Sequence, residues 1–239
     1  MRKSLIAASA AALAIGGAGV AYAQNAAPSI VVNTSVSPSK AGTKKQPKAE
    51  KFTLTVTNNV SESKATASSI KITFPSTLKL STKGLPQCTK SDAAIINAPT
   101  TACKKSIAGT GTSHAVVGPT TAAPLPVTFQ VIPIVGKNQM LYYLNGPAVD
   151  TQAVLHGKIS GRSQTITIPS NLQQPAPGLY SAIQDLRTVI SLKKGKHSLV
   201  TSSGCSGGHK ITVSETFVDN PTPPAARSAT QTGIAACKK

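Results

Sequence analysis

Apolar and hydroxyl-bearing residues alternate along much of this chain. In Phe52–Thr57 every second residue is apolar and threonines fill the other positions, and Ile70–Phe74 repeats the alternation. Strict alternation is typical of a β-strand with one buried face. Similar runs predict strands at Ser29–Val36, Val127–Val135, Met140–Leu144, Ala153–Ile159, Gln164–Ile168, Ile183–Leu192, Leu199–Ser202 and Lys210–Phe217. Asp185–Arg187 also suits a short helix.

Glycine and proline separate these runs, and no sustained helical period is present. Many short strands with frequent turns predict an all-β fold, an antiparallel β-sandwich of the immunoglobulin-like or a related type. We expect an N-terminal strand and a mobile basic loop over residues 24–51, and the sandwich over residues 52–219. Residues 220–239 are rich in proline and alanine and are expected to form a tail. Gly109-Thr110-Gly111 is interpreted as a turn.

The first 23 residues have the composition of a secretory signal peptide. Arg2 and Lys3 precede an apolar run, Leu5–Ala21, which ends in Ala21-Tyr22-Ala23. Small residues at these positions predict cleavage after Ala23. Three glycines interrupt the run, and at about 17 residues it is short for a membrane anchor. We therefore expect a secreted or cell-envelope protein without a transmembrane span in the mature chain.

Four cysteines, Cys88, Cys103, Cys205 and Cys237, follow the predicted signal. An even number of cysteines in an exported chain predicts disulfides. Three connectivities are open, and the local pairs 88–103 and 205–237 are preferred because each pair falls in its own segment. Zinc ligands usually come in close pairs, which this sequence lacks, so no metal site is predicted.

The most enzyme-like string is Cys205-Ser206-Gly207-Gly208-His209, in which a cysteine lies near a histidine. Because the chain is predicted to be exported, a disulfide at Cys205 is favoured over a nucleophilic thiolate. The seven carboxylates are spread singly along the chain, and no acid/base pair stands out among them. We expect no catalytic or cofactor-binding residue and hence no enzyme; the alternative is an exported hydrolase whose site is not recognisable from sequence.

Positive charge is the main functional indication. The chain has 25 Lys and Arg against 7 Asp and Glu, a net charge of +18, which falls to +16 without Arg2 and Lys3. Two clusters stand out: Lys40, Lys44, Lys45, Lys48 and Lys51, and then Lys193, Lys194 and Lys196. Such clusters attract polyanions. They lack the aromatic residues on which bases stack, so no specific nucleic-acid partner is expected. Alternatively, the lysines only maintain solubility and protect strand edges.

The cysteine segment carries a resemblance to other proteins. Lys83-Gly84-Leu85-Pro86-Gln87-Cys88 and Ala102–Gly111, which reads A-C-K-K-S-I-A-G-T-G, are followed by a proline-rich element and by the late Cys205. This G-L-P-x-C … A-C-x-x-S-x-x-G-x-G pattern resembles a group of uncharacterised exported β-rich proteins of high-GC Gram-positive bacteria. The resemblance implies export, β-structure and disulfides, and it transfers no site residues. We expect a non-catalytic protein of structural or binding character that contacts anionic envelope polymers or a lipid surface.

Overall fold

The computed structural model describes residues 28–60, 65–220 and 226–239. The predicted signal peptide and its cleavage site lie outside these ranges. No helix in the described ranges is long and apolar enough to cross a membrane.

Eleven strands form one continuous sheet in which every hydrogen-bonded neighbour is antiparallel. This architecture confirms the all-β, antiparallel prediction. In sheet order the strands are β1 (Ser29–Ser37), β3 (Lys51–Asn59), β11 (Tyr180–Ile190), β6 (Gly109–Gly118), β7 (Leu125–Gly136), β8 (Gln139–Gly146), β9 (Thr151–Ser160), β10 (Ser163–Thr167), β4 (Ala65–Thr73), β15 (His209–Asp219) and β16 (Arg227–Ala235).

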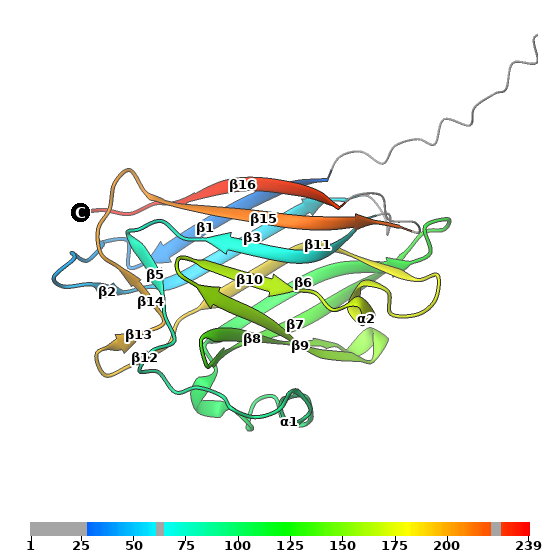
Figure 1. The fold of residues 1–239 in the computed structure, drawn as a ribbon, viewed down its shortest axis with the longest axis horizontal. Coiled ribbons are helices and arrows are strands. Elements are labelled where there is room, and N and C mark those ends of the chain that lie inside the picture. Colours follow the sequence, from blue (N-terminus) through cyan, green and yellow to red (C-terminus); the bar gives the residue numbers. More distant parts are fainter. Residues whose placement is uncertain (1–27, 61–64, 221–225) are drawn as a thin grey trace, which may run out of the picture.

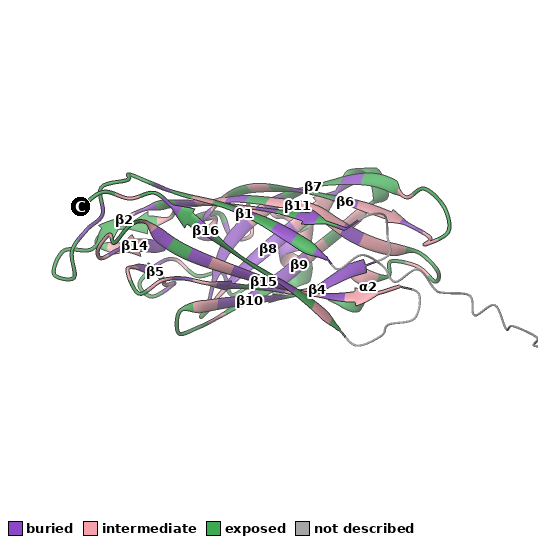
Figure 2. Ribbon diagram, turned by 90° about the horizontal axis from the view of Figure 1, so that it is seen from above, coloured by how far each residue is buried: buried purple, intermediate pink, exposed green. Residues whose placement is uncertain are grey.

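The sheet folds over into two layers, with β1, β11, β6 and β7 in one and β10, β4 and β15 in the other (Figure 2). As a result the last strand, β16, returns beside the first, β1 (Figure 1). A Cβ atom on Gly233 would lie 2.9 Å from the carbonyl oxygen of Val32, so only glycine allows this approach. Beyond the strands, the Lys238 amide donates to the Ser39 carbonyl at 2.7 Å. We call this junction of β1 and β16 the seam.

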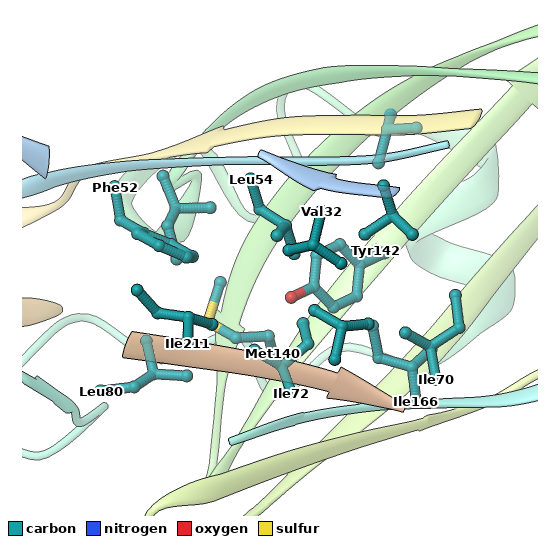
Figure 3. Packing of buried hydrophobic residues seen from close by; sticks show 14 of the residues in the cluster. Val32, Phe52, Leu54, Ile70, Ile72, Leu80, Met140, Tyr142, Ile166 and Ile211 are labelled. Atoms are coloured by element: carbon teal, nitrogen blue, oxygen red, sulfur yellow. The ribbon is translucent and has the colours of Figure 1, made fainter. Parts of the chain in front are cut away.

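Alternating apolar residues of both layers meet between them and form the main core (Figure 3). Val32, Phe52 and Leu54 come from one layer, and Ile70 and Ile211 face them from the other. Each fully buried side chain of this kind contributes about 1.5–3 kcal/mol of transfer free energy. The alternation that predicted the strands therefore also builds the core.

A second, smaller core lies on the outer face of β7, β8 and β9. The cysteine segment covers this face with α1 (Asp92–Asn97) and the 3₁₀ turn η2 (Lys104–Ser106). Ile95 of α1 is fully buried there beside Leu141 and Tyr143 of β8. Disulfides join Cys88 to Cys103 and Cys205 to Cys237, which confirms the predicted bridges and the preferred pairing.

Short elements complete the fold at the two ends of the sandwich. At one end lie a three-stranded sheet and a hairpin, and at the other a helical turn and a 3₁₀ turn (Figure 1). The small sheet contains β2 (Lys48–Ala49), β14 (Val200–Ser202) and β5 (Leu78–Leu80), and the hairpin contains β12 (Lys193–Lys194) and β13 (His197–Ser198). The turns are α2 (Ser170–Gln173) and η3 (Pro147–Val149).

Two segments differ from the sequence prediction. Residues 109–111, interpreted as a turn, begin the inner strand β6, and β16 forms within the predicted tail. The glycines of β6 serve close packing, since a Cβ on Gly109 would lie 1.8 Å from the Val189 carbonyl oxygen. Since β1 and β16 both belong to the main sheet, the segments expected to flank the sandwich contribute strands to it. Asp185–Arg187 lies in strand β11, and no helix forms there.

Candidate functional site

Both predicted lysine clusters lie at the same end of the sandwich, which we call the lysine end. Its elements are the 38–50 connection with the first residue of β3, β5 and the turn after it, the β12–β13 hairpin and the C-terminal residues (Figure 1). Twelve exposed lysines belong to it: Lys40, Lys44, Lys45, Lys48, Lys51, Lys79, Lys83, Lys193, Lys194, Lys196, Lys238 and Lys239.

Backbone contacts join these segments, which are far apart in the sequence. Lys40 and Lys238 form an isolated β-bridge, which adds the C-terminal lysines to the first cluster. Gly84 packs against the ring of His197, since a Cβ at Gly84 would lie 2.5 Å from it, and this contact sets Lys83 beside the hairpin. The sequence did not predict that Lys79 and Lys83 join the two clusters, because an isolated lysine gives no local signal of its position in the fold.

The connection that bears the first cluster, predicted to be a mobile loop, is tied to its surroundings. The Ala41 amide donates to the Lys238 carbonyl at 2.8 Å, and the Gly42 amide donates to Ser202 Oγ at 3.1 Å. The Ser202 hydroxyl in turn donates to the buried carboxylate of Glu50. Strand β2 then pairs with β14. The lysines therefore project from a backbone with defined partners.

Acidic side chains do not neutralise the surface of the lysine end within the described residues. Glu50 belongs to this end but is only 2% exposed, and burial raises its pKa while Ser202 and Lys48 oppose the rise. Asp92 and Asp185 each lie close to a histidine elsewhere, at 3.0 Å from His156 and 2.9 Å from His114. The other described carboxylates are Asp150, which follows η3, Asp219, which ends β15, and Glu215, which is buried in the middle of β15. A surface of one sign focuses an attractive potential for anions.

Cys205, the candidate nucleophile of the enzyme-like string, is bonded to Cys237. His209 is buried and its Nδ1 lies 2.9 Å from Thr77 Oγ1; burial lowers its pKa, so the ring is neutral near pH 7. Among the described residues, no serine hydroxyl is within hydrogen-bond distance of a histidine. The hydrolase alternative thus gains no supporting geometry in this part of the chain.

A cavity of about 370 Å³ lies at the end of the sandwich opposite the lysines. Its lining comes from β6, β7, β8, β9, β11, η3 and the segment around α2, and it contains neither a histidine nor a carboxylate. The chain matches no family model, no curated protein and no solved structure, so similarity assigns it neither a family nor an activity.

Proposed function

We propose that this protein is an exported, non-catalytic binding protein whose lysine end contacts the anionic polymers of the cell envelope. The observation that carries the proposal is the convergence of two lysine clusters from opposite halves of the sequence on one end of the sandwich. Lysines that served only solubility would have no reason to converge, and mixed charges serve solubility better.

The chemistry of the lysine end suits a repetitive polyanion better than a small ligand. Its ammonium groups are exposed and strongly hydrated, and they act as separate point charges. Binding would come from release of the counterions condensed on the polymer, which needs many weak contacts and no deep pocket. The hydrogen bonds that fix the 38–50 connection hold the charges in place before binding, which lowers the entropic cost of contact.

Four substitutions test whether location, and not net charge, determines binding. The test variant carries glutamine in place of Lys44, Lys45, Lys193 and Lys194. The control variant carries glutamine in place of Lys71, Lys90, Lys104 and Lys105. Both variants lose the same charge, but the control lysines are exposed on β4 and the cysteine segment. With immobilised polyphosphate, the slope of log K against log salt should fall by about three in the test variant and change little in the control.

Equal losses in the two variants would show that binding follows net charge alone, and the proposal would be wrong. The same variants should be mixed with vesicles that contain an anionic phospholipid. Binding of wild-type protein to vesicles but not to polyphosphate would replace the polymer by a lipid surface as the partner.

A further inference from the structure

The cavity opposite the lysine end exists because small residues occupy inward positions of two neighbouring strands. Ala115 of β6 and Ser181 of β11 line it, near core positions that hold larger residues such as Leu155 and Ile168. Larger side chains close its sides, among them Phe129, Leu155 and Ile183. The resulting space, about 370 Å³, is near the lower limit of pockets that hold small ligands.

The polar groups in the lining have their hydrogens already committed. Ser113 Oγ donates to the Asp185 carbonyl at 2.8 Å, beside the bulge in β11. The Ser181 hydroxyl donates to the Leu172 carbonyl, and Thr151 Oγ1 donates to the Val149 carbonyl at 3.1 Å. No charged side chain lines the cavity. The side chains of the lining therefore offer a ligand no free hydrogen-bond donor and no charge, which favours an apolar, uncharged ligand.

The mouth of the cavity is bordered by apolar residues that face solvent. Leu125, Val149 and Leu179 are 70%, 37% and 38% exposed, and they are three of the five exposed large apolar residues in the described part of the chain. They come from three separate segments, and no lysine or arginine lies in the connections 119–124, 147–150 and 168–179 around them. An apolar rim gives a hydrocarbon chain a continuous path from a lipid aggregate into the cavity, without passage through water.

We propose that this cavity binds one hydrocarbon chain of a lipid, whose headgroup stays outside the apolar rim. A peptide is a poorer occupant, because its backbone carbonyls would need hydrogen-bond donors that the side chains of this lining do not offer. A lipid chain needs none. The site is independent of the lysine end, since it lies at the opposite end and uses no charge.

The test measures binding of the neutral fluorophore N-phenyl-1-naphthylamine and its displacement by neutral monoacylglycerols of increasing chain length. A neutral probe does not report on the lysines. Ala115→Phe should fill the cavity and weaken probe binding by about tenfold or more, with a melting temperature unchanged or higher. Val117→Phe, nearer the mouth, provides a second filling variant if Ala115→Phe fails to fold.

A rim variant with a matched control tests the path into the cavity. Leu125→Ser with Leu179→Ser should slow uptake of a monoacylglycerol from micelles, whereas Val31→Ser with Ile234→Ser should not. Val31 and Ile234 are the other exposed large apolar residues and do not line the cavity. Probe binding that survives both filling variants would overturn the proposal. Displacement by a synthetic peptide of residues 5–21 but not by monoacylglycerol would also overturn it and identify a peptide site.

Discussion

Replacing Glu215 by glutamine is expected to stabilise the protein by about 3 kcal/mol near pH 8.5 and by very little near pH 4. Glu215 lies on the inner face of β15 and is 1% exposed. Burial raises the pKa of its carboxyl from 4.5 to about 7, and a hydrogen bond with Asn58 opposes the rise. Glutamine resembles the protonated acid in shape and carries no charge at any pH.

The pH dependence of this stabilisation follows from the number of protons that the folded and unfolded chains bind. Between pH 4.5 and about 7 the folded protein keeps the Glu215 proton that the unfolded chain has lost. The free energy of unfolding of the wild type therefore falls as pH rises through this window, and it is lower by a constant amount above it. Chemical denaturation at several pH values should show the two proteins diverging over this window.

Other titrating groups do not disturb the comparison, since they are present in both proteins. The pKa of Glu50 is raised, so Glu50, like Glu215, makes the free energy of unfolding fall as pH rises. The pKa of His209 is lowered, so His209 makes the free energy of unfolding rise with pH. Asp150→Asn, at an exposed carboxylate, serves as the control and should leave the profile unchanged. Parallel profiles for wild type and Glu215→Gln would contradict the prediction.

Removing the Cys205–Cys237 disulfide should lower the free energy of unfolding by about 4 kcal/mol. The loss of protection from hydrogen exchange should be greatest in β16. The bridge spans 32 residues and ties the chain just beyond β16 to the segment just before β15. Without the bridge, the unfolded chain gains more conformational freedom than the folded chain, which lowers the free energy of unfolding. Strand β16 lies at the edge of the sheet and then relies on its hydrogen bonds with β15. In Cys205→Ser with Cys237→Ser, hydrogen exchange should show faster exchange of the β16 amides.

The other disulfide supplies the matched control. Cys88–Cys103 spans 15 residues, so Cys88→Ser with Cys103→Ser should cost about 3 kcal/mol and expose the segment around α1. The two variants should therefore lose exchange protection in different places. Faster exchange of the same amides in both would show that the bridges do not stabilise separate parts of the fold.

Local patterns predicted the strands whose burial alternates most regularly. Phe52–Thr57 and Lys210–Phe217 were found because a half-buried strand needs an apolar residue at every second position. Strand β6 was missed because Gly109 and Gly111, typical turn residues, serve there to admit a neighbouring backbone. Strand β16 was missed because its composition of serine, threonine and alanine also suits an unstructured tail.

The candidate sites depend on topology more than on local sequence. Each lysine cluster was visible, but only the sheet order brings Lys40 to Lys238 and Lys83 to the β12–β13 hairpin. The cavity could not be predicted from the sequence, because small inward residues such as Ala115 and Ser181 only weaken the alternating pattern of a strand. Cysteine pairing was the exception, because each bridge joins neighbouring segments and so could be predicted from proximity in the sequence.

The seam also has a consequence for the order of folding. Val32 and Gly233 touch across it, although almost the whole described chain lies between them. Such a contact closes a very long loop and forms only after the C-terminal strand is available. A chain that emerges N-terminus first would therefore hold β1 with one edge uncovered until β16 arrives.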